Sequence, residues 1–143
     1  LEAAKALFFE GIELLARDAL AQAEAKFNEA LRLAPDRASI LTNLAATEAR
    51  LGKLDAARGH ARRAVALDES AAEGWLNLAQ IEAQLDDVAA AVAACRKALA
   101  IDPGHAGGWA LLAALHDRGG ELREAADAYR KALQGDSQQF EWL

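Results

Sequence analysis

The sequence predicts an all-α protein built from stacked helical hairpins, and the first observation behind this prediction is a repeat. An alanine recurs every 34 residues, and a second alanine follows each one seven positions later. The members of these two columns are Ala23, Ala57, Ala91 and Ala125, then Ala30, Ala64, Ala98 and Ala132. A fixed period kept four times without insertion is typical of equal units in a stack, because each unit buries its apolar face only against a neighbour.

The second observation is that large and small residues keep the same register inside each unit. In the first half, a large apolar residue precedes a small one by about one helical turn: Leu7, Leu41, Trp75 and Trp109 before Gly11, Ala45, Ala79 and Ala113. In the second half, the columns are Phe27, Ala61, Cys95 and Tyr129, then Leu31, Val65, Leu99 and Leu133. Small residues allow two helices to approach closely, so we expect these columns to form the core of helical hairpins.

Turn residues divide each unit into two helices. The inner turn falls at Asp18, Gly52, Asp86 or Gly120, and Pro35 or Pro103 closes the outer one, since proline cannot continue the preceding helix. We predict repeats at about 4–37, 38–71, 72–105 and 106–139 in a single domain spanning 1–143. Residues 140–143 are interpreted as the start of a truncated fifth repeat or of a capping helix.

One stretch of the third unit resembles a known family. The spacing Trp75-x-x-Leu78-Ala79, followed by Ala91-x-x-x-Cys95 and Pro103, is similar to the tetratricopeptide repeat pattern, which has the same period. The resemblance covers about residues 4–139 and implies an α-α superhelix, a right-handed solenoid of helix-turn-helix hairpins. It also implies that the first helix of each hairpin lines a concave groove, which holds a peptide or helix of a protein partner.

Matching columns imply which side chains line that groove. They are Lys5, Phe8, Phe9, Ile12, Leu15, Ser39, Thr42, Asn43, Ala46, Arg50, Glu73, Leu76, Asn77, Gln80, Gln84, Ala110, Leu111, Ala114, Asp117 and Arg118. Phe8, Phe9, Ile12 and Leu76 are expected to be apolar anchors. The column of Asn43 and Asn77 has two interpretations: amides that pair with the backbone of an extended peptide, or a residue that is simply common there.

The two groove arginines have a further expected role. Arg50 and Arg118 are expected to attract an acidic side chain of the ligand, although Glu73 and Asp117 oppose them and leave a weak net field.

Composition and motif spacing exclude several other classes of function. The net charge of −6 argues against nucleic-acid binding, which needs a concentrated basic face. No window approaches the ~18–20 apolar residues of a membrane span. The three histidines lack the spacing of helical metal ligands, and Cys95, the one cysteine, is expected to be a buried apolar residue. We therefore expect no metal, no cofactor and no catalytic activity.

A polar column replaces the aromatic residue that the family usually has. Its members are Glu48, Glu82 and His116, and we interpret them as hydrogen-bonding to neighbouring helices rather than as acid and base catalysts.

The leading functional hypothesis is a non-catalytic scaffold for protein–protein interaction. The alternative is the recruitment or regulatory arm of a larger enzyme, of the glycosyltransferase or sulfotransferase type. Self-association through the ends is a further possibility, because the first helix is apolar nearly all round; its candidate residues are Phe8, Phe9, Phe140 and Trp142. A cytoplasmic location is expected, and the absence of a cysteine pair is compatible with it; an envelope compartment is the alternative, because disulfides are optional there.

Overall fold

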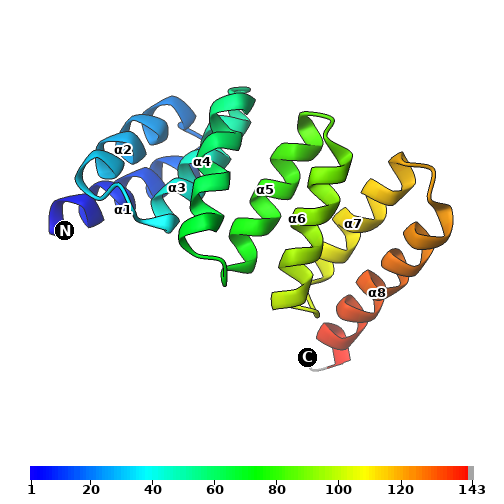
Figure 1. Cartoon of the computed structure of the whole chain (residues 1–143). Coiled ribbons are helices and arrows are strands. Elements are labelled where there is room, and N and C mark those ends of the chain that lie inside the picture. The colour runs from blue at the N-terminus through cyan, green and yellow to red at the C-terminus, as the bar shows by residue number, and fades with distance from the viewer. Residues whose placement is uncertain (142–143) are drawn as a thin grey trace. The chain divides into compact units, whose positions relative to one another are not determined.

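The computed structural model describes the backbone of residues 1–141 and the side chains of residues 1–135. It confirms the all-α prediction, with the helices arranged as consecutive antiparallel pairs (Figure 1). The helices are α1 (Glu2–Ala16), α2 (Leu20–Leu33), α3 (Ala38–Arg50), α4 (Leu54–Leu67), α5 (Ala72–Gln84), α6 (Val88–Ile101), α7 (Ala106–Arg118) and α8 (Leu122–Glu141).

The four hairpins group into two compact units. Unit 1 comprises Leu1–Glu69 and contains α1 to α4, and unit 2 comprises Ser70–Leu143 and contains α5 to α8. Besides the contacts inside each hairpin, α3 packs against α1 and α2 in unit 1, and α7 packs against α5 and α6 in unit 2. Each unit is therefore a pair of stacked hairpins. That all four hairpins form a single domain remains a prediction.

The two alanine columns lie in the core, as the repeat predicts. All eight of their members are buried. Phe27, Ala61 and Cys95 are fully buried too, but Tyr129 is 46% exposed and Leu133 is 66% exposed. The prediction that the last two lie in the core is wrong. Phe27 on α2 and Cys95 on α6 lie on helices against which the next hairpin of the same unit packs, whereas within the described residues α8 packs only against α7.

The four inner turns share one backbone geometry. Asp18, Gly52, Asp86 and Gly120 have φ angles of 61°, 83°, 62° and 76°, in the left-handed region. In the first turn, the Ala19 N–H donates to the Leu14 carbonyl and the Asp18 N–H to the Leu15 carbonyl, and the same pair of bonds recurs in the other three. This is the Schellman arrangement, which satisfies the last carbonyls of a helix. The predicted inner turns are confirmed.

The outer turns differ at the last hairpin. Pro35 follows α2 and Pro103 follows α6, and α2, α4 and α6 each contain 14 residues. By contrast, α8 contains 20 residues and continues to Glu141. Ser137 stands in the proline column there, and its backbone N–H does not interrupt a helix. That residues 140–143 begin a truncated fifth repeat or a capping helix stays a prediction. Across the described residues, no helix is long and apolar enough to cross a membrane.

Candidate functional site

The predicted groove residues lie on the first helix of each hairpin. In unit 1 they include Lys5, Phe8, Phe9, Ile12 and Leu15 on α1, and Ser39, Asn43 and Arg50 on α3. In unit 2 they include Leu76, Asn77, Gln80 and Gln84 on α5, and Leu111 and Arg118 on α7. Because α1 contacts α3 and α5 contacts α7, the first helices of each unit are neighbours. Phe140 and Trp142, the other candidates for self-association, have side chains outside the described residues.

The apolar residues of α1 divide into a buried and an exposed set. Phe8, Ile12 and Leu15 are partly buried and pack against the core cluster that contains Phe27. The ring centroid of Phe8 lies 5.9 Å from the ring centroid of Phe27 and 5.6 Å from that of Phe9. Phe9 itself is 53% exposed. Phe9 is therefore the aromatic side chain of α1 that is most available to a partner, while Phe8 mainly holds α1 in place.

Leu76 needs a correction, because it is only 6% exposed. Its Cδ2 atom lies 3.4 Å from the position that a Cβ would occupy on Gly108, so it packs beneath the start of α7. A side chain enclosed in this way is not an accessible anchor. On the same helix, Gln80 and Gln84 are exposed, and Leu111 on α7 is partly buried.

Asn43 forms hydrogen bonds inside its own helix. Its Nδ2 donates to the Ser39 carbonyl at 2.9 Å, and the Thr47 hydroxyl donates to the Asn43 backbone carbonyl at 2.7 Å. The Ser39 bond fixes the orientation of the amide. It leaves the amide oxygen and one N–H of the side chain for a partner.

Arg50 and Arg118 are ion-paired with aspartates of the preceding turns. Arg50 donates to the carboxylate of Asp18, and Arg118 donates to Asp86 at 2.7 Å and to the Ala83 carbonyl at 3.3 Å. Each arginine therefore connects one hairpin to the left-handed residue of the hairpin before it. Each guanidinium is already paired with a carboxylate of the protein, so Arg50 and Arg118 are less able to attract an acidic ligand than we expected.

The polar column of Glu48, Glu82 and His116 is buried. The Glu48 carboxylate lies 2.6 Å from Nδ1 of His60 on α4, which confirms for this residue the interpretation as a contact between helices. His116 Nδ1 lies 3.5 Å from the Glu121 carboxylate. Within residues 1–135, no cluster of three or more histidine, cysteine, aspartate or glutamate residues is arranged to hold a metal ion.

Cys95 is a free thiol that is buried, as predicted. Its Sγ lies 3.1 Å from the Gly108 carbonyl oxygen, at the contact between α6 and α7. Burial raises the pKa of this thiol to about 11, because the thiolate is poorly solvated there. Since the thiolate is the reactive form, nucleophilic or redox chemistry is disfavoured at this position.

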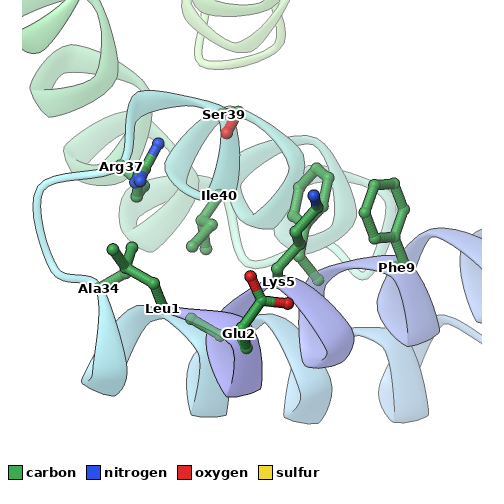
Figure 2. Close-up of a pocket in the computed structure, with 10 residues that line it drawn as sticks. Leu1, Glu2, Lys5, Phe9, Ala34, Arg37, Ser39 and Ile40 are labelled. Carbon is green, nitrogen blue, oxygen red and sulfur yellow. The ribbon is translucent and has the colours of Figure 1, made fainter.

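A pocket of about 390 Å³ lies in unit 1 between α1 and the start of α3. Figure 2 shows Lys5 and Phe9 on the α1 side, with Arg37, Ser39 and Ile40 at the start of α3. The residues that line it are Leu1, Glu2, Ala4, Lys5, Phe8, Phe9, Ala34, Arg37, Ser39 and Ile40. The structure therefore brings together four of the predicted groove residues, namely Lys5, Phe8, Phe9 and Ser39.

Sequence reasoning missed Arg37 and Ile40 as lining residues. Arg37 lies in the outer turn, just before α3, and Ile40 is buried with its side chain in the core cluster beneath the pocket. The 34-residue columns indicate which helix face a residue occupies. They do not indicate that the outer turn comes close to the start of α1, so no simple signal in the sequence identifies these two.

The pocket carries two cations without ion-pair partners. In the part of the chain whose side chains are described, neither Lys5 nor Arg37 forms an ion pair, and Glu2 is the one carboxylate in the lining. Other cations of unit 1 have carboxylate partners, among them Lys26 with Glu10, Arg50 with Asp18, Lys53 with Glu24 and Arg63 with Asp36. Lys5 and Arg37 therefore place unpaired positive charge at this pocket.

Comparisons with known proteins give one family and a consistent fold. Residues 42–106 match the family model described as "Tetratricopeptide repeat". No curated protein is significantly similar to the sequence. A crystal structure of MamA superposes with a TM-score of 0.91 at 19% identity, covering 96% of this chain and 81% of that one.

Two further solved structures show the same fold. MamA 41-end from Desulfovibrio magneticus RS-1 has a TM-score of 0.88 at 19% identity, with coverages of 95% and 77%. YrrB, described as a TPR protein with an unusual peptide-binding site, has a TM-score of 0.83 at 21% identity, with coverages of 93% and 69%. At these identities the likeness establishes the fold of this chain and leaves its ligand to be argued from its own residues.

Proposed function

We propose that this chain, whose residues 42–106 match the tetratricopeptide repeat family model, is a non-catalytic interaction module that holds a segment of a partner protein against α1 and α3. The observation that carries the proposal is the pocket between these helices, with the half-exposed ring of Phe9 in its lining. The peptide-binding site described for YrrB supports it by analogy of fold.

The energetics of the pocket suit a short peptide. Covering the exposed half of the Phe9 ring contributes on the order of 1 kcal/mol, and an apolar side chain seated against Phe8 and Ile40 adds its own burial. The free oxygen and N–H of the Asn43 amide offer one point of pairing for the backbone of an extended segment. Most of the affinity would come from the apolar contacts.

A selection from a random peptide library displayed on phage, with the whole chain as bait, tests this proposal. Selected peptides are then synthesised, and their affinities are measured by fluorescence anisotropy. Phe9→Ser should weaken binding severalfold or more, whereas Tyr129→Ser, which removes a similarly exposed ring from α8, should leave it unchanged. Failure to select any peptide, or equal affinity in the two variants, would contradict the proposed site.

Self-association is a second candidate, favoured by one exposed ring and two exposed leucines of α8. Tyr129, Leu133 and Leu122 are exposed, and the first two occupy columns that a following hairpin buries elsewhere in the chain. A second copy that covered them would give an oligomer whose mass rises with concentration. Light scattering over a concentration series tests this for the wild type beside Tyr129→Ser and Phe9→Ser. A monomer at every concentration would rule it out.

Two further parts of the proposal are the absence of catalysis and a cytoplasmic location. The free, buried Cys95 is compatible with a reducing compartment and requires no disulfide partner. Fractionation of cells that express the native gene tests the location, and recovery in a secreted or envelope fraction would overturn it.

A further inference from the structure

The pocket between α1 and α3 combines an apolar floor with two cations. Ala4, Phe8 and Ile40 form part of its apolar lining, while Lys5 stands on α1 and Arg37 stands in the turn before α3 (Figure 2). Both cations are exposed. Among the charged side chains of the lining, Lys5 and Arg37 are cations and Glu2 is the one carboxylate, so the side chains of the lining carry a net positive charge.

We infer that the pocket recognises an acidic segment of a partner, in which an Asp or Glu side chain is next to a bulky apolar residue. This inference rests on the proposed function and adds the chemical class of the ligand. The apolar residue would occupy the space beside Phe8 and Ile40, and the carboxylate would lie between Lys5 and Arg37. Guanidinium and ammonium groups form their strongest hydrogen bonds with carboxylates.

The availability of these two cations is what selects the ligand. The groove arginines Arg50 and Arg118 already hold Asp18 and Asp86, so a ligand carboxylate would have to displace them. Lys5 and Arg37 form no ion pair in the part of the chain whose side chains are described. A carboxylate from outside therefore gains their attraction without breaking an existing contact.

The start of α3 adds to this preference. In the structure, Arg37 is the residue before α3, no side chain caps that end, and its first turn contains no acidic residue. The unpaired N–H groups at a helix start carry partial positive charge and favour an anion. An acidic side chain held by Arg37 would lie close to these N–H groups, whereas a basic segment would meet repulsion from both cations and from the helix end.

The experiment uses the whole chain and the peptides selected from the random library. Enrichment of Asp or Glu next to Leu, Ile, Phe or Trp is expected among them. A selected peptide is synthesised with an amidated C-terminus, so that its side chain supplies the carboxylate, and is paired with a version in which Asp or Glu becomes Asn or Gln. The neutral peptide should bind wild type roughly tenfold more weakly.

Matched variants locate the effect. Lys5→Gln with Arg37→Gln should lower the affinity for the acidic peptide roughly tenfold and leave the neutral peptide almost unaffected. Arg17→Gln with Arg32→Gln removes two exposed cations outside the pocket and should change neither affinity. Added salt should lower the affinity for the acidic peptide more than the affinity for the neutral one.

The outcomes separate this inference from the proposed function. Selected peptides that depend on Phe9 but show no acidic enrichment, or that bind the Lys5/Arg37 variant as tightly as wild type, would overturn the inference and leave the function standing. The absence of any selected peptide would overturn both. Unchanged thermal unfolding of the Lys5/Arg37 variant shows that a loss of affinity is not a loss of fold.

Discussion

Gly11 on α1 lies against the buried ring of Phe27, and this contact provides a sharp test of how unit 1 is packed. A Cβ atom on Gly11 would lie 2.6 Å from Cε1, 2.8 Å from Cδ1 and 2.9 Å from Cζ of Phe27. Non-bonded carbon atoms normally stay about 3.5–4.0 Å apart. The ring is fully buried and cannot move into solvent. Alanine at position 11 must therefore push α1 away from α2.

The size of the effect follows from two opposing contributions. Replacing glycine by alanine inside a helix stabilises it by about 1 kcal/mol. Overpacking a rigid core typically costs about 1–3 kcal/mol, and three overlapping ring atoms place Gly11→Ala toward the upper end. We expect a net loss of about 1–2 kcal/mol. Gly59 on α4 is the matched control, because a Cβ there has no neighbouring atom within 4 Å and Gly59→Ala keeps only the stabilising contribution.

Urea denaturation followed by circular dichroism measures both variants against the wild type. The two midpoints should move in opposite directions, with the free energies of unfolding about 2–3 kcal/mol apart. A second substitution, Phe27→Leu, removes part of the ring and should reduce the penalty of alanine at position 11. If Gly11→Ala were as stable as Gly59→Ala, the close packing of α1 on Phe27 would be refuted.

Three other predictions concern unit 2. The exposed pair of Asp86 and Arg118 should show a coupling of ~0.2–1 kcal/mol in a double-mutant cycle of alanine variants measured by urea denaturation, and zero coupling would mean that the contact does not stabilise the fold. In the same assay, Gly120→Ala should lower the free energy of unfolding by ~1–2 kcal/mol, because φ is +76° at this residue. A Cβ there would have no neighbour within 4 Å, so the loss would come from the backbone alone, and an unchanged free energy would exclude the left-handed turn. The raised pKa of Cys95, about 11 against 9.0 for a free thiol, means that the unfolded chain loses this proton first as the pH rises. The free energy of unfolding should therefore decrease by about 2–3 kcal/mol between pH 9.0 and about 11. In Cys95→Ala, urea denaturation across this pH range should show a smaller decrease, because the contribution of the thiol is absent.

The repeat predicted the helices and the inner turns because both depend on local and periodic features. Glycine at positions 52 and 120 tolerates a left-handed backbone, and aspartate at 18 and 86 is one of the few other residues that does. The alanine columns are buried because a helical period places them on the face toward the partner helix. These properties can be read from one unit and applied to the next.

The same columns failed where burial depends on a neighbouring hairpin. Tyr129 occupies the column of Phe27 and Cys95, but its exposure is set by what packs on α8 and not by its own residue type. For Leu76 the error was the opposite: we expected an accessible anchor, but the side chain is buried because Gly108 allows α7 to pack closely over it. A column identifies a face of a helix, whereas accessibility is a property of the assembled hairpins.

The pocket was only half predictable for a related reason. Lys5, Phe8, Phe9 and Ser39 follow from the columns of the first helices. Arg37 belongs to an outer turn, and its proximity to the start of α1 follows from how the first hairpin packs against the second.

The distribution of ion pairs gives a reason why recognition would concentrate at the start of α1 and not farther along the first helices. Aspartate at the first and third inner turns is opposite an arginine 32 residues later, in the pairs Asp18–Arg50 and Asp86–Arg118. Each pair joins the inner end of one hairpin to the next, so the positive charge at the inner ends of α3 and α7 is engaged within the protein. Lys5 lies near the opposite end of α1, beside the outer turn that carries Arg37. A ligand that bound at the inner ends would compete with contacts between hairpins, whereas a ligand that bound at the pocket would not.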